Sequence, residues 1–152
     1  MKVLKKWYFW YKFDKKKVWI WKILELKVFN LQDVCELTDN INTAKSLIRT
    51  LLSLNYIKRV KHNLYAVCNI EFKSVIADQY MIASKIKDDS YISYHSAFDY
   101  YGVKNQMFYT VYVSSKKRFG NFEFDGYDYT FVNSKYDFGI VQNGKVRVTD
   151  KE

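Results

Sequence analysis

The sequence predicts an α+β protein in two parts: three helices with a basic hairpin, then a module of helices and antiparallel sheet. Two observations indicate this division. Apolar residues recur at helical spacing up to about residue 54, whereas alternating, β-forming runs dominate after residue 106. Helices and strands do not alternate in the second part, and no glycine-rich phosphate loop occurs there. A parallel α/β fold is therefore not expected.

Composition and charge agree with a folded chain that meets a polyanion. Hydrophobic residues make up 49% of the 152 residues and aromatic residues 19%, enough for a packed core in one ordinary domain or two small ones. The net charge is +9. Residues 1–62 hold 14 Lys and Arg against 5 Asp and Glu, while residues 63–152 hold 11 of each kind. The excess positive charge lies in the first part, which indicates an anionic partner for that part alone.

The first two helices are predicted from apolar spacing and capping. Residues Lys17 to Leu26 have the spacing of a helix. Asn30 is a good N-cap, and Asp33 three residues later approximates a capping box, so a second helix is expected from Leu31 to Leu37.

A third helix is predicted from a cap at Asn42 or Thr43 to about Leu54, and its two faces differ sharply. One face is an apolar stripe: Ala44, Leu47, Ile48, Leu51 and Leu54. The opposite face carries two cations and four hydroxyls: Thr43, Lys45, Ser46, Arg49, Thr50 and Ser53. A solvated helix face usually mixes charges of both signs, but this one has no acid. Its side chains are those that hydrogen-bond to phosphates and base edges.

Two short strands follow, over residues 55–60 and 63–68, around a basic turn. The cations cluster at this turn: Lys58, Arg59, Lys61 and His62. Three helices followed by a basic hairpin form a winged helix-turn-helix, in which the third helix enters the major groove and the hairpin lies along the backbone. We therefore assign residues 1–70 to a DNA-binding domain of this type. The same elements also serve as protein-interaction domains, which is the alternative.

The remainder, residues 71–152, is predicted to be a separate α+β domain. One helix is expected from Glu71 to Ile86 and another over residues 91–103, with Ser93 as its N-cap and Gly102 at its end. Strands are predicted over residues 107–115, 121–133 and 138–150, with hairpin turns at Asp125-Gly126 and Asn143-Gly144. The last four residues form a capping box from Thr149 to Glu152, so we expect this domain to be truncated and to continue into a further helix.

Other chemistries suggested by single motifs are disfavoured. Ser93, His95, Ser96 and Asp99 lie too close along one helix for a hydrolase triad, and no GxSxG motif occurs. Glu123, Asp125 and Asp128 are better explained by a hairpin turn than by a nuclease metal site.

Neither the aromatic residues nor the cysteines indicate a ligand. Aromatics of the second part are typical of a sheet core rather than of base stacking. Cys35 and Cys68 lack metal-site spacing and are expected to be free thiols in a cytoplasmic protein. No apolar run is long enough to span a membrane. The basic, aromatic first 17 residues have no assigned role, and binding to a membrane surface is the weaker alternative for them.

The order of these motifs resembles the AbiEi-type antitoxins of abortive-infection toxin–antitoxin systems. The likeness covers residues 28–152 and is carried by "VFNLQDV", "LIRTLLSLNYIKRVKHNLYAV", "QYMIASKI", "YISYHSAFDYYGV", "TVYVSS" and "VRVTDKE". It departs from the family at Asn63, where glycine is usual, and in lacking prolines before "YIS" and "TVYV".

The resemblance implies a cytoplasmic transcriptional autorepressor that binds inverted repeats in its own promoter. It also implies an antitoxin that counteracts a nucleotidyltransferase-type toxin, with or without direct contact. The DNA-binding role falls on Thr43, Lys45, Ser46, Arg49, Thr50, Lys58, Arg59, Lys61 and His62. No catalytic residue, cofactor or metal is expected. The alternatives are an enzyme acting on nucleic acid, either a nuclease or a nucleotidyltransferase with a winged-helix guide, and a winged-helix adaptor that binds only protein.

Overall fold

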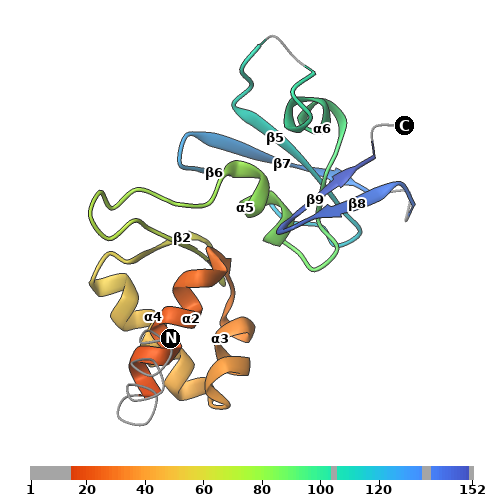
Figure 1. Cartoon of the computed structure of the whole chain (residues 1–152). Helices are drawn as coiled ribbons and strands as arrows, with labels where there is room; N and C mark the ends of the chain where they lie inside the picture. Colours follow the sequence, from red (N-terminus) through yellow and green to blue (C-terminus); the bar gives the residue numbers. More distant parts are fainter. Residues whose placement is uncertain (1–14, 104–105, 135–137, 151–152) are drawn as a thin grey trace, which may run out of the picture. The chain divides into compact units, whose positions relative to one another are not determined.

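The computed structural model describes residues 15–103, 106–134 and 138–150, which form an α+β fold with five helices and two sheets (Figure 1). The chain divides into two compact units. Unit 1 comprises the described residues up to Arg59 together with Tyr65–Ile76, and unit 2 comprises Val60–Leu64 and the described residues from Ala77 onward. The expected boundary between residues 70 and 71 falls within the Tyr65–Ile76 segment.

The described residues of unit 1 form the helices α2 (Lys15–Leu26), α3 (Leu31–Thr38) and α4 (Ile41–Ser53). The capping box of α3 is confirmed, since the Asn30 side chain accepts from the Asp33 backbone N–H at 3.0 Å and the Asp33 carboxylate accepts from the Asn30 N–H at 2.8 Å.

The predicted cap of the third helix is wrong. The side chain of Asn40 accepts from the backbone N–H groups of Asn42 and Thr43, at 2.8 and 3.1 Å, so α4 begins before both of the predicted caps. A helix begins where an Asn or Asp side chain can accept from two backbone N–H groups that have no partner within the helix.

A three-stranded sheet has the strand order β1 (Val28–Phe29), β3 (Leu64–Val67) and β2 (Ile57–Lys61). Its β2–β3 hairpin begins in unit 1, and the tip of the hairpin, Val60–Leu64, is grouped with unit 2. β1 pairs antiparallel with β3, and the rings of Phe29 and Tyr65 stack with centroids 5.6 Å apart.

The core of unit 1 joins the helices to this sheet. Its buried members are Ile23, Phe29, Val34, Ala44, Leu47, Ile48, Leu51, Ile57, Tyr65 and Val67. The predicted apolar stripe of α4 is therefore confirmed except at Leu54, which lies beyond the helix end and is 48% exposed.

Unit 2 is built on a sheet of six described strands in the order β6-β7-β5-β4-β9-β8. Their bounds are β4 (Tyr91–Ile92), β5 (Thr110–Ser115), β6 (Phe122–Phe124), β7 (Tyr127–Asn133), β8 (Ile140–Asn143) and β9 (Val146–Thr149). The expected hairpins are confirmed, because β6 pairs antiparallel with β7 and β8 with β9. Asp125 and Gly126 both have positive φ, as a tight hairpin turn requires.

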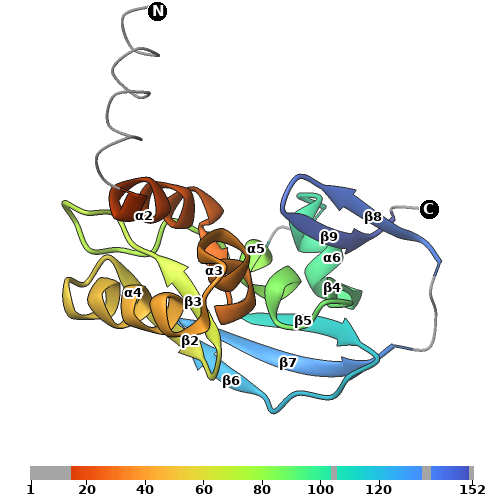
Figure 2. The same cartoon turned by 90° about the horizontal axis from the view of Figure 1, so that it is seen from below.

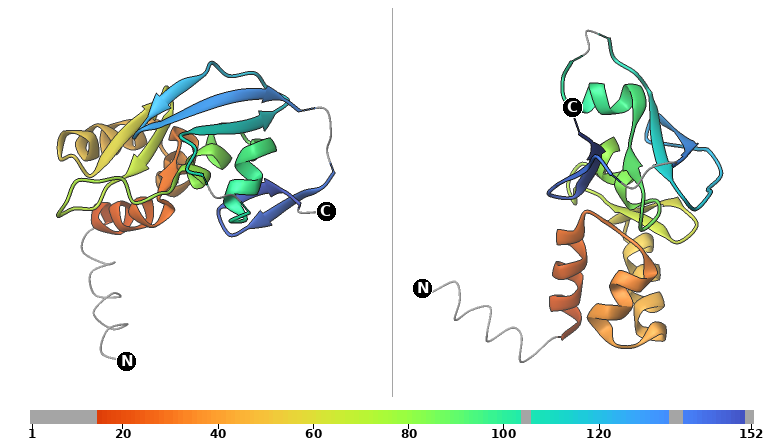
Figure 3. Two further views of the ribbon diagram at one scale, coloured as in Figure 1. Left: turned by 90° about the horizontal axis from the view of Figure 1, so that it is seen from above. Right: turned by 90° about the vertical axis from the view of Figure 1, so that its right-hand side faces the viewer.

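The prediction of a purely antiparallel sheet is wrong. β5 pairs parallel with β7, and β4 pairs parallel with β9 (Figure 2 shows β5 beside β7). β7 lies between β6 and β5 in the sheet. It is antiparallel to β6, to which the hairpin turn joins it, and parallel to β5 on its other edge. The sheet curves around α5 (Gln79–Lys85) and α6 (Tyr94–Tyr100), which lie between its β5–β7 end and its β8–β9 end (Figure 3).

Both helices of unit 2 are shorter than expected. The helix predicted from Glu71 begins only at Gln79, because the Asp78 side chain caps that point. Before that point, the Asn69 side chain accepts from the backbone N–H groups of Glu71 and Phe72, at 2.8 and 3.1 Å, and holds them in a turn.

The helix predicted over residues 91–103 is α6 alone, because Tyr91 and Ile92 form β4. Ser93 occupies the N-cap position, but its hydroxyl bonds to the Ser114 hydroxyl at 2.7 Å instead of capping the helix. Gly102, with φ +71°, follows the helix as expected. The capping box expected at the end of the chain extends into residues 151–152, which lie outside the described ranges.

Candidate nucleic-acid interface

The polar face of α4 is the first part of the candidate site. The buried residues Ala44, Leu47, Ile48 and Leu51 fix which side of the helix faces the core. Lys45, Ser46 and Arg49 are consequently exposed. Within the described part of the chain, the side chains of Lys45 and Arg49 form no ion pair or hydrogen bond with a protein group. Two adjacent cations without a carboxylate produce a local positive field that attracts anions.

The hydroxyl groups of this face differ in whether they already donate a hydrogen bond to the helix backbone. The Thr50 hydroxyl donates to the Ser46 carbonyl at 3.0 Å, and the Ser53 hydroxyl donates to the Thr50 carbonyl at 2.7 Å. Both protons are thus used within the helix, although each oxygen can still accept. Thr43 is half-buried and Ser46 is exposed. Ser46 is therefore the hydroxyl best placed to donate to a ligand.

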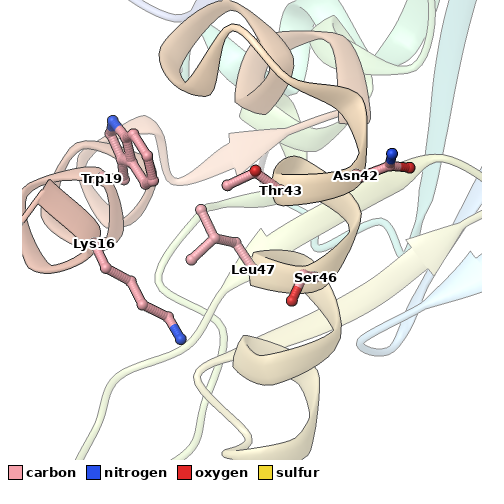
Figure 4. Close-up of a pocket in the computed structure, with 6 residues that line it drawn as sticks. All are labelled: Lys16, Trp19, Asn42, Thr43, Ser46 and Leu47. Atoms are coloured by element: carbon pink, nitrogen blue, oxygen red, sulfur yellow. The ribbon is translucent and has the colours of Figure 1, made fainter.

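A hollow of about 320 Å³ lies beside this face, between α2 and α4. It is lined by Lys16, Trp19, Asn42, Thr43, Ser46 and Leu47. In Figure 4, Lys16 and Trp19 extend from α2, while Thr43 and Leu47 extend toward them from α4. The hollow thus combines an apolar floor with a cation and hydroxyls, so a sugar–phosphate backbone could be held there through both kinds of contact.

The basic hairpin divides into two pairs of residues. Lys58 and Arg59 are exposed on β2 in unit 1, and the Arg59 guanidinium lies 5.8 Å from the centroid of the Tyr65 ring. Lys61 and the exposed His62 belong to the hairpin tip, Val60–Leu64, which is grouped with unit 2. Only the first pair therefore shares a compact unit with α4.

Lys61 differs from the other basic residues of the predicted site because it is half-buried. Its ammonium lies over the rings of Phe119 and Phe122, 5.1 and 5.2 Å from their centroids. Burial and the positive charge of Lys87 both lower the pKa of Lys61. Its charge is thus partly engaged by the aromatic rings of unit 2.

The serine, histidine and aspartate near α6 do not assemble as a triad. The Ser96 hydroxyl accepts from the Tyr112 N–H at 2.8 Å, and the Asp99 carboxylate accepts from the Tyr80 hydroxyl at 2.8 Å. His95 is exposed, and its ring meets the edge of Tyr112. These side chains are occupied in joining α5, α6 and β5, so the geometry of nucleophile, base and orienting acid is missing here.

The other motifs also yield no reactive site within the residues described. No cluster of three or more His, Cys, Asp or Glu suited to a metal occurs there, including around Asp125 and Asp128. Neither Cys35 nor Cys68 takes part in a disulfide within the described residues. None of the described helices has the length and apolar character needed to cross a membrane.

Sequence reasoning missed three residues that line the hollow: Lys16, Trp19 and Asn42. The run of three lysines at positions 15–17 was a usable signal, since it places cations at the start of the first helix. That α2 and α4 lie side by side at this point could not be read from the sequence, because it depends on how both helices pack on the shared core.

Comparison of the chain with models of known protein families found no match, and comparison with curated proteins found none either.

Proposed function

We propose that this chain is a DNA-binding transcriptional autorepressor and the antitoxin of an abortive-infection toxin–antitoxin system. In this proposal unit 1 acts as a winged helix-turn-helix, α4 is its recognition helix, and the β2–β3 hairpin is its wing. The observation that carries the proposal is the face of α4, where Lys45 and Arg49 are exposed beside Ser46 with no acid on the helix. The antitoxin role rests on the resemblance of the motifs, and the partner it implies is a nucleotidyltransferase-type toxin.

The chemistry of the face suits a duplex. Arg49 can bind guanine O6 and N7 in the major groove with both arms of its guanidinium, which is worth roughly 1–3 kcal/mol of base discrimination. Lys45, Lys58 and Arg59 have the charge and exposure to contact phosphates. Lys16, from the hollow beside α4, adds a further cation near the same helix.

The test is fluorescence anisotropy of the full chain on labelled duplex from its own upstream region and on a shuffled duplex, across a salt series. Lys45→Ala should weaken both complexes and make the slope of log K against log salt shallower by about 0.9, as expected for one lost phosphate contact. Arg49→Ala should weaken the specific complex more than the shuffled one.

Arg49→Lys is the matched variant, because it keeps the charge and loses the planar pair of donors. It should retain the salt slope and lose the preference for the native duplex. The charge-matched control in unit 2 is Lys145→Ala, an exposed residue in the turn between β8 and β9, which should change neither quantity. Wild-type affinity that is unaffected by Lys45→Ala and Arg49→Ala would exclude α4 as the reading helix.

The antitoxin part is tested separately: it predicts a gene for a nucleotidyltransferase beside that of the chain, and the two proteins are co-expressed. Growth that the toxin arrests should recover when the chain is present. Metal-dependent cleavage of the labelled duplex would instead support the enzyme alternative, and absence of any duplex binding would support the protein-binding adaptor.

A further inference from the structure

Two aromatic rings of unit 2 hold the ammonium of Lys61. The Lys61 Nζ lies over both rings, 5.1 Å from the centroid of Phe119 and 5.2 Å from that of Phe122. A cation within about 6 Å of a ring centroid is attracted by the negative face of the ring. The two rings are inclined at 63° to each other, with centroids 6.4 Å apart, so they act on the cation from two directions. Lys61 is thus bound by the protein itself.

This ring pair, Phe119 and Phe122, is fixed by the packing around it. Phe119 is 5% exposed and meets Phe131 edge-on, with centroids 5.3 Å apart. Phe122 belongs to β6 and stacks on the buried Tyr129 of β7, with centroids 4.9 Å apart. Because these contacts do not depend on Lys61, the rings form a preorganised site for a cation, which lowers the entropy cost of occupying it.

The rings, and not an acid, keep Lys61 in this position. No ion pair joins Lys61 to a carboxylate of the described residues. The neighbouring charge that lowers its pKa, after the larger effect of burial, is that of another cation, Lys87. The half-buried ammonium has lost part of its hydration, and the rings occupy two of its sides. A phosphate could surround this ammonium only if it left the rings.

The position of Lys61 in the hairpin gives this contact a consequence. Lys61 is the last residue of β2, the first strand of the proposed wing. Lys58 in the same strand and His62 in the turn that follows are both exposed, and neither lies over a ring of the described residues. The hairpin therefore carries cations that a phosphate can reach and one cation that the ring pair withholds.

We propose that the ring pair forms an autoinhibitory contact, which withholds the ammonium of Lys61 from the phosphate backbone of duplex DNA until the contact opens. This inference rests on the proposed function, because it concerns the wing of the same DNA-binding domain. It adds that unit 2 limits the affinity of the wing, so any event that separates Lys61 from the rings strengthens DNA binding.

The first test is the salt dependence of duplex binding by the full chain carrying Phe122→Leu, which removes one ring face without changing charge. The freed ammonium should add one phosphate contact, so the slope of log K against log salt should become steeper by about 0.9. The gain in affinity should accordingly shrink about threefold between 50 and 200 mM salt. Phe124→Leu is the matched control, since this ring lies in the same strand but not over Lys61, and it should leave the slope unchanged.

The second test compares two lysines of β2 and does not require a change in the core. Lys58→Ala should make the slope shallower by about 0.9, whereas Lys61→Ala in the otherwise wild-type chain should leave it unchanged. Lys61→Ala combined with Phe122→Leu should abolish the steeper slope of Phe122→Leu. A Lys61→Ala variant that loses as much slope as Lys58→Ala would show that Lys61 already contacts phosphate, which overturns the inference and leaves the proposed function standing.

A measurement without DNA separates the two proposals further. In NMR spectra the ring currents of Phe119 and Phe122 should shift the Hε protons of Lys61 upfield, and Phe122→Leu should move them toward the position of an exposed lysine. A shift in Phe122→Leu equal to that of the wild type would refute the contact, whatever the DNA data show. A shift that is lost while the slope stays constant would refute the inhibition. If the wild-type chain binds no duplex, the proposed function fails and the inhibition fails with it.

Discussion

Replacing Tyr129 with phenylalanine should stabilise unit 2. Tyr129 lies in β7, is 1% exposed, and stacks on Phe122 with ring centroids 4.9 Å apart and an angle of 14° between the planes. Its hydroxyl is buried, and no described residue forms a hydrogen bond with it. The change to phenylalanine removes this oxygen and keeps the stacked ring.

The magnitude follows from the solvation of the hydroxyl. Burying a hydroxyl without a partner costs about 1–3 kcal/mol. Part of this gain is offset by the small void that the missing oxygen leaves. Tyr129→Phe should therefore raise the free energy of unfolding by about 1 kcal/mol at neutral pH, which corresponds to roughly 2–4 °C in Tm for a chain of this size.

The pH dependence provides an independent check on the same group. Burial, reinforced by the negative charge of Asp125, raises the pKa of Tyr129 above its ordinary value of 10.0. In the unfolded chain the phenol ionises near pH 10, while in the folded chain it stays protonated. The contribution of this group to stability is therefore fully present below pH 10 and is lost as the pH rises beyond it. The advantage of the phenylalanine variant should widen in that range.

Urea denaturation at pH 7 and above pH 10 measures both effects, and Tyr80→Phe is the matched control. The Tyr80 hydroxyl donates to the Asp99 carboxylate at 2.8 Å, so its removal should lower the free energy of unfolding by about 1–2 kcal/mol at pH 7. The two variants remove the same atom and should change stability in opposite directions. Loss of more than about 1 kcal/mol in Tyr129→Phe would refute the reasoning, because it would mean that the hydroxyl has a partner.

Two further substitutions test the contacts at the start of α3 and near the end of α5. Asn30→Ala removes the side-chain oxygen that accepts from the Asp33 N–H at the start of α3, and it keeps the backbone N–H that donates to the Asp33 carboxylate. It should cost about 1 kcal/mol, measured by urea denaturation; no change would mean that water replaces the cap. Arg147→Met removes the guanidinium that donates to the Ser84 and Lys87 carbonyls at 2.6 and 3.1 Å, near the end of α5, and should cost about 2–3 kcal/mol in the same assay. Arg147→Lys should recover only part of this loss, since an ammonium cannot reproduce the fork of donors.

The features that sequence reasoning predicted correctly depend on residues close together in the chain. The capping box of Asn30 and Asp33 spans three residues, and the turn at Asp125-Gly126 spans two. The buried stripe of α4 follows from helical spacing alone, which also determines that Lys45 and Arg49 face away from the core. The face proposed to read DNA was therefore accessible from sequence.

The errors have a common physical origin in contacts between distant residues. Tyr91 and Ile92 look like the start of a helix, but β5 and β9 provide edges with which they pair instead. The parallel directions within the sheet depend on which edge of a strand the next hairpin occupies, and hydrophobic alternation is the same for either direction. The side chains of Asn69 and Asp78 accept hydrogen bonds from nearby backbone N–H groups, and these bonds compete with helix formation. Helix propensity alone does not account for this competition.

Total charge was the least informative quantity for unit 2, because opposite charges cancel in a sum even when they lie apart on the surface. Asp89 is 27 residues before Lys116 in the chain, yet its carboxylate accepts from the Lys116 N–H and orders the turn that contains Lys116, Lys117 and Arg118. An acid that contributes to electrical neutrality thus acts here as a support for a basic cluster. Phosphates respond to the local field within about 8–10 Å at physiological salt, not to the sum over a domain. How charge is distributed over the folded surface therefore depends on contacts between distant residues, such as that of the Asp89 carboxylate with the Lys116 N–H, and a sum over the sequence does not contain them.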